Sequence, residues 1–150
     1  SKYYTLTVTI TITQGEIMAA VIYLDAVFTA ESPKRLCLHS VVVNPHEAGA
    51  IRDIYTKKNL SGTGSIFVNA AKLEELYCIL RGLCLPHGSQ VIIYADDDSI
   101  CEKKITGTNQ KIWNKIQAFC DEEEYQVAYA YQGLMQESIR KATAQYAFGE

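Results

Sequence analysis

The sequence has no excess of positive charge and no long apolar run. Fourteen Lys and Arg stand against 17 Asp and Glu, which gives a net charge of −3, so no overall basic field attracts nucleic acid or a membrane surface. No apolar run reaches the roughly 18 residues of a membrane-spanning helix. The N-terminus also lacks the basic segment and apolar core of a secretory signal. We therefore expect an intracellular protein of the cytoplasm or nucleus, with no membrane partner.

Paired cysteine motifs are also missing. The five cysteines are odd in number and scattered, with no CxxC pair and no histidine at zinc-binding spacing. We interpret them as small apolar residues in a reducing compartment. They are Cys37, Cys78, Cys84, Cys101 and Cys120.

Repeats and low-complexity segments are absent as well, and the composition is that of a globular domain. Apolar residues make up 48% of the 150 positions and charged residues 21%. A chain of this length can bury a sizeable core, so we expect a single domain over residues 1–150.

The stretch SQVIIYADDDS, residues 89–99, is the most informative in the chain. Its apolar run from Val91 to Tyr94 predicts a central, parallel strand covered on both faces. Ligands of open α/β sheets gather at the carboxyl ends of such strands, where Asp96 stands. Asp97 and Asp98 fit a solvated turn and a helix cap better. Asp96 is therefore a candidate ligand residue.

Three strands are predicted before this point. Residues 3–13 alternate apolar and threonine side chains, residues 17–28 form a second strand with Asp25 near its end, and residues 35–43 form a third. Residues 46–58 fit a helix capped by Asn44-Pro45, but the stretch IRDIYTK within them fits a short strand equally well, and the sequence alone does not decide between them.

Helices and strands alternate in the second half. A leucine stripe predicts an amphipathic helix over residues 69–84, with Glu75 beside the stripe. A short helix over 99–105, a helix over 110–123 with Trp113 in the core, a strand over 125–131 and a helix over 134–148 follow. The order predicts helices on the faces of one mixed sheet.

This order resembles the ribonuclease H-like superfamily. The matching pieces are IYLDAVF, LEELYCILRGL, VIIYADDDS, QKIWNKIQAF and VAYAYQG, within residues 17–148. The resemblance implies an α/β fold with a mixed five-stranded sheet and helices on both faces, built as a three-strand meander followed by α-β-α-β-α.

The resemblance also implies a chemistry. Members of the family cleave the RNA strand of an RNA–DNA hybrid with two Mg²⁺ or Mn²⁺ ions, which carboxylates hold about 4 Å apart. Magnesium prefers oxygen ligands. By resemblance, Asp25, Glu75 and Asp96 are the metal ligands and catalytic residues.

Several positions depart from the family pattern. Ala26-Val27 follow Asp25 where Gly-Ser or Gly-Ala is usual, and Tyr131-Gln132-Gly133 replace a loop histidine. The fourth acid falls near Lys141 or Ala142, and Glu137 comes too early. A second register is also open, in which residues 3–14 are the first core strand and Gln14 takes the first catalytic position.

Three functions follow from these alternatives. The first is a metal-dependent nuclease acting on RNA–DNA hybrids, and another is a nuclease of the same superfamily acting on DNA. The remaining one is an inactive domain that serves as a structural or interaction module in a larger polymerase or retroelement-type protein. Lys57-Lys58 and Lys103-Lys104 are the local basic pairs available for a phosphate backbone.

Overall fold

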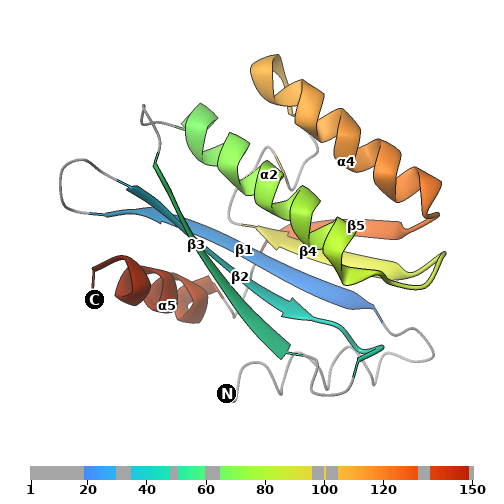
Figure 1. Cartoon of the computed structure of the whole chain (residues 1–150), viewed down its shortest axis with the longest axis horizontal. Coiled ribbons are helices and arrows are strands. Elements are labelled where there is room, and N and C mark those ends of the chain that lie inside the picture. Colours follow the sequence, from blue (N-terminus) through green and yellow to red (C-terminus); the bar gives the residue numbers. More distant parts are fainter. Residues whose placement is uncertain are drawn as a thin grey trace.

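The computed structural model describes residues 19–29, 35–47, 51–59, 65–95, 100, 105–131 and 136–148. They form one mixed five-stranded sheet with helices on both faces (Figure 1). The strands are β1 (Ala20–Phe28), β2 (Arg35–Val43), β3 (Ile51–Asn59), β4 (Gln90–Ala95) and β5 (Gln126–Tyr131). The helices are α2 (Ser65–Leu83), α4 (Gln110–Glu122) and α5 (Gln136–Phe148), with a 3-10 turn η1 (Gly107–Asn109) before α4.

The strand order is β3-β2-β1-β4-β5. Strands β1, β2 and β3 form an antiparallel meander, and β4 and β5 run parallel to β1. This confirms the predicted α/β fold. The structure also decides between the two registers of the first core strand. The meander begins with β1, the strand that carries Asp25, and β1 pairs with the parallel strand β4. The strand predicted over residues 3–13, and all of the helix predicted over 99–105 except Ile100 and Ile105, lie outside the described residues.

The segment that the sequence left open, residues 46–58, contains a strand. Strand β3 pairs with β2 along its whole length, from Ile51 opposite Val43 to Asn59 opposite Arg35. Its Ile, Tyr and Thr side chains favour a half-buried pleated strand, and the tertiary pairing outweighs the helix signal at Asn44-Pro45.

The larger core lies between the sheet and the pair α2 and α4, on what we call the α2 face. Leucines at helical spacing on α2 pack there against Ile22 and Leu24 of β1 and Ile93 of β4. Helix α4 adds Trp113 and Ile116. The predicted stripe and the predicted core position of Trp113 are confirmed. The leucines are Leu73, Leu76, Leu80 and Leu83.

The opposite face, which we call the α5 face, has a smaller apolar cluster. Val21, Tyr23, Val41 and Val43 pack with Ile139 of α5. Helix α5 contacts β1 and β2, so the side chains of β4 that point to this face, Gln90, Ile92 and Tyr94, stay half-buried. Strand β4 is therefore central and parallel, as predicted, but fully covered on one face only.

None of the helices in the described ranges combines the length and apolar character that a membrane span requires.

The phenol of Tyr129 supplies a test of the packing on the α2 face. Tyr129 lies beside Trp113, with ring centroids 5.4 Å apart, and Gln117 Nε2 donates to its hydroxyl at 3.0 Å. Burial raises the pKa of Tyr129 to about 12, against a smaller lowering effect of the Gln117 hydrogen bond. The neutral phenol is thus favoured in the folded state.

We predict that Tyr129→Phe makes the protein less sensitive to alkali. Because the folded pKa of Tyr129 lies above the unfolded value of about 10, its stabilisation is complete below pH ~10 and is lost as the pH rises toward 12. Urea unfolding between pH 8 and 12 measures this. The wild type should lose on the order of 2 kcal/mol more than the variant over that range. Parallel pH profiles would contradict the burial of this phenol.

Candidate active site

Asp25 lies on the α5 face of β1. Side chains alternate along the strand, so Ile22 and Leu24 point to the α2 face while Val21, Tyr23 and Asp25 point to the other. The residue is 1% exposed, and both carboxylate oxygens are out of contact with solvent. A buried carboxylate needs compensating charge or hydrogen bonds to remain ionised.

Helix α5 supplies that charge. Arg140 Nη2 lies 2.7 Å from Asp25 Oδ1. The Arg140 side chain is 47% exposed, so it reaches from the surface of α5 down to the sheet. The guanidinium takes the position beside Asp25 that a cationic ligand of this carboxylate would use. The sequence analysis placed Lys141, one residue further along, where the family has its fourth acid, and a cation there would repel metal ions. It missed Arg140.

His39 extends this polar layer across the sheet. It is opposite Asp25 in the β1–β2 register and is fully buried. Its Nε2 lies 2.8 Å from Asp53 Oδ1 of β3, and its Nδ1 lies 3.3 Å from Thr143 Oγ1 of α5. Thr143 donates its hydroxyl hydrogen to the Ile139 carbonyl at 2.7 Å. Toward His39 it can therefore only accept, so both ring nitrogens face acceptors.

Stacked aromatic rings lie at the β3 end of this polar layer. His39 stacks on Tyr55 with centroids 4.2 Å apart, and Tyr55 stacks on Tyr146 of α5 at 4.5 Å. Lys57 Nζ lies 4.9 Å from the centroid of the Tyr146 ring. Burial and the nearby Asp53 raise the pKa of Tyr55. His39 is thus a packed residue of the protein interior.

Glu75 lies on the other face of the sheet. It is half-buried on α2 and accepts a hydrogen bond from Thr56 Oγ1 of β3 at 3.4 Å. Strand β2 separates β3 from β1, so this hydrogen bond directs Glu75 toward the sheet edge. Asp25 points to α5 instead.

The side chain that α2 buries one turn earlier is a lysine. Lys72 is 4% exposed and stands between Ala71 and Leu73, which are both in the core. The helix from which the resemblance predicts an acidic metal ligand therefore also buries a cation. Sequence reasoning missed Lys72, although its place beside the leucine stripe was a usable signal.

The remaining predicted positions are only partly described. Asp96, Gln132 and Gly133 lie outside the described residues, while Glu137 and Lys141 are exposed on α5. The set Asp25, Glu75 and Asp96 thus stays a prediction. Within the ranges that the structure covers, no group of three or more His, Cys, Asp or Glu side chains is placed to hold a metal ion.

The described residues around Asp25, taken by themselves, do not fit a divalent cation. A metal ion at Oδ1 would meet the Arg140 guanidinium, whose nitrogen already lies at ion-pair distance, and two cations at one carboxylate repel each other.

Comparison with solved structures identifies the fold. LC11-RNase H1, isolated from compost by a metagenomic approach, superposes with a TM-score of 0.58 at 14% identity, over 86% of this chain and 94% of that one. The chain has a ribonuclease H-like fold. The N-terminal RNase H domain of Rv2228c from Mycobacterium tuberculosis matches with a TM-score of 0.53 at 12% identity, over 85% and 98% of the two chains.

A larger protein also contains this ribonuclease H-like fold. The foamy viral protease-reverse transcriptase in complex with RNA/DNA hybrid matches with a TM-score of 0.53 at 10% identity. The match covers 87% of this chain and 19% of the viral one. No family model matches the sequence, and the search of curated proteins finds no match.

The Asp25–Arg140 ion pair can be tested through stability. Arg140→Met keeps the apolar stem and removes the charge, which leaves the Asp25 carboxylate without this partner. We expect the free energy of unfolding at pH 7 to fall by about 2–3 kcal/mol, measured by urea denaturation. Asp25→Asn in the Arg140→Met background should recover part of the loss, because the amide is neutral.

The matched control is Lys141→Met, at the exposed neighbouring position. It should stay within about 0.5 kcal/mol of the wild type. Equal effects of the two methionine variants would show that the ion pair contributes nothing to stability.

Proposed function

We propose that this chain is a ribonuclease H-like domain that does not hydrolyse nucleic acid. On this proposal it serves as a structural or interaction domain of a larger polymerase or retroelement-type protein. The observation that carries the proposal is the ion pair between Asp25 and Arg140, which places a guanidinium at the carboxylate that the resemblance assigns to Mg²⁺ or Mn²⁺.

Two further features support an inactive site. The buried cation Lys72 on α2 adds positive charge to the helix that should contribute an acid. Glu75, the candidate acid on that helix, bonds to Thr56 at the sheet edge. Hydrolysis of an RNA–DNA hybrid would require Asp25 to leave Arg140 and Glu75 to leave Thr56, with a metal ion supplying the energy for both changes.

The place of this domain in a larger protein is supported by analogy of fold. The match to the foamy viral protease-reverse transcriptase spans a fifth or less of that chain, so a fold of this kind is one part of a polymerase there. Fold alone does not fix the function, which is why the state of the site carries the proposal.

Incubation with a labelled RNA–DNA hybrid in Mg²⁺ or Mn²⁺ tests the activity. We expect no cleavage, while an active ribonuclease H1 under the same conditions serves as the positive control. Cleavage that disappears in Asp25→Asn would overturn the proposal and favour the nuclease. Cleavage that survives in Asp25→Asn would indicate a contaminating enzyme.

Metal binding gives a second measurement that does not depend on activity. Titration of ¹⁵N-labelled protein with Mn²⁺ should leave the amide signals of Asp25 and its strand neighbours unbroadened. In Arg140→Asp, which replaces the cation by a second carboxylate, we expect Mn²⁺ broadening at Asp25. Broadening at Asp25 in the wild type would contradict the proposal.

A further inference from the structure

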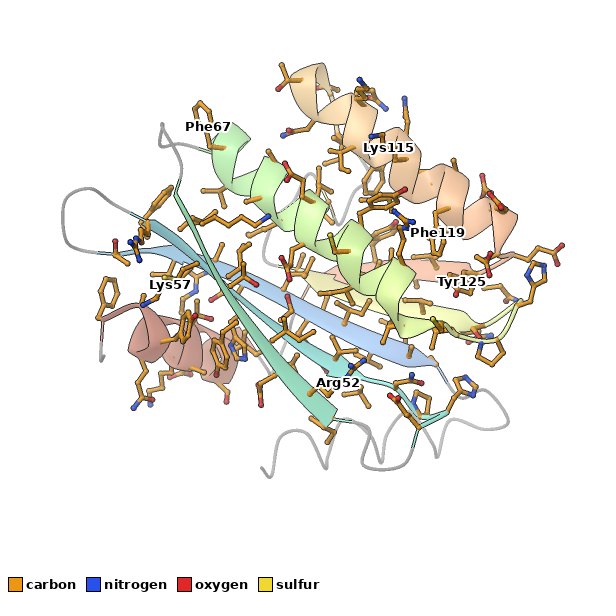
Figure 2. The ribbon with its side chains drawn as sticks, viewed as in Figure 1. Arg52, Lys57, Phe67, Lys115, Phe119 and Tyr125 are labelled. Atoms are coloured by element: carbon orange, nitrogen blue, oxygen red, sulfur yellow. The ribbon has the colours of Figure 1, made fainter. Side chains whose placement is uncertain are left out.

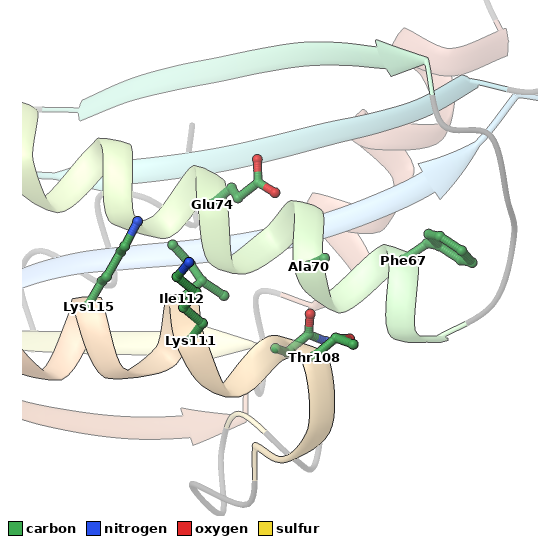
Figure 3. A pocket seen from close by; sticks show the side chains of 8 residues that line it. Phe67, Ala70, Glu74, Thr108, Lys111, Ile112 and Lys115 are labelled. Atoms are coloured by element: carbon green, nitrogen blue, oxygen red, sulfur yellow. The ribbon is translucent and has the colours of Figure 1, made fainter.

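We propose that the groove between the N-terminal halves of α2 and α4 binds an acidic segment of a partner protein that carries large apolar side chains. This deepens the proposed interaction role of the domain and rests on it. The groove has a volume of about 570 Å³. Figure 3 shows its two helical walls, with α2 on one side and α4 on the other.

The floor and one end of the groove are apolar. Phe67 and Ala70 line it from α2, and Ile112 lines it from α4. Phe67 is 43% exposed and stands at the outer end of α2 (Figure 2). Ile112 is half-buried and packs against the larger core on the α2 face. An apolar side chain of a partner could pack against this exposed ring and the partly exposed apolar floor.

The α4 wall is positively charged. Lys111 and Lys115 line the groove one helical turn apart and are both exposed. Neither has an ion-pair partner among the residues that the structure describes. These two ammonium groups therefore remain available for acidic side chains of a ligand.

The one acid of the groove does not neutralise this wall. Glu74 belongs to α2, and its Oε1 lies 3.8 Å from Lys58 Nζ of β3. In Figure 3 its carboxylate points away from α4. Neither α2 nor α4 has an acid in its first turn, so the positive ends of both helix dipoles also favour an anionic ligand here.

The chemistry fits an acidic peptide better than a nucleic-acid backbone. A phosphate backbone is bound through a row of cations that neutralise successive phosphates, whereas this groove offers two free lysines above an apolar floor. Acidic residues that flank one or two large apolar residues match both features of the groove.

Two synthetic peptides of equal length test the proposal on the full chain. One carries Leu and Phe at helical spacing between Asp and Glu residues, and the other has Lys in place of every acid. In ¹⁵N NMR titrations the acidic peptide should shift the amide signals of Phe67, Ala70, Ile112 and Lys115. The basic peptide should shift none of them at the same concentration.

Substitutions locate the interaction. The double variant Lys111→Glu/Lys115→Glu should weaken binding of the acidic peptide at least tenfold, and Phe67→Ala should weaken it several-fold. Lys141→Glu, an equivalent charge reversal on α5, should leave binding unchanged. Thermal unfolding of each variant shows whether the fold is intact. Unchanged affinity in a folded Lys111→Glu/Lys115→Glu variant would overturn the proposal.

A short RNA–DNA hybrid without metal is the third probe. Tighter binding of this hybrid than of the acidic peptide, with shifts at the same amides, would assign the groove to nucleic acid and overturn the peptide assignment. Because every readout is binding, these outcomes are independent of the cleavage experiment. Cleavage of the hybrid would refute the proposal of an inactive site but would not change the amide shifts caused by the peptide. Absence of these shifts would refute peptide binding in the groove but would say nothing about cleavage.

Discussion

The carboxylate of Asp25 is buried in the middle of the sheet, and the placement of α5 depends on it. An ionised carboxylate removed from water has a large desolvation cost unless a cation or several donors compensate it. Arg140 brings a guanidinium to within 2.7 Å of it and so ties α5 to β1. The apolar cluster on this face is small, so this ion pair is a substantial part of the contact between the helix and the sheet.

On the proposal of an inactive site, the same face explains how the fold could persist while its chemistry changed. A carboxylate at this position is satisfied by a metal ion or by an arginine, since both supply positive charge at ion-pair distance. Exchange of one for the other removes Lewis acidity and the activation of water, while the sheet, the helix and their contact remain. His39, Thr143 and Asp53 strengthen the contact without adding a metal ligand set.

The regular elements could be predicted because their signals are local. The leucine stripe predicts the helix α2, and the short apolar run predicts the strand β4, each from a pattern within a single segment. The structure corrected one detail, the half-buried α5 face of β4, because coverage depends on where a distant helix packs. Whether the segment of β3 is a helix or a strand could not be predicted, because its pairing with β2 decides this rather than its local propensity.

The candidate site was harder to predict because its contacts join residues that are far apart in the sequence. Asp25 was singled out by its place at the end of an apolar strand. Arg140 and Lys72 were not, since a cation on an amphipathic helix resembles a solvated surface residue until the helix is placed on the sheet. Charge alone did not reveal which side of each helix is buried.

The contact between His39 and Thr143 joins residues 104 positions apart. During synthesis on the ribosome, Val21, Val41, His39 and Asp25 therefore emerge long before the helix that covers them. Local contacts can form first on the α2 face, whereas closure of the α5 face waits for the last segment described here. Until then the partly formed sheet exposes to solvent the histidine, carboxylate and valine side chains that are buried in the folded protein.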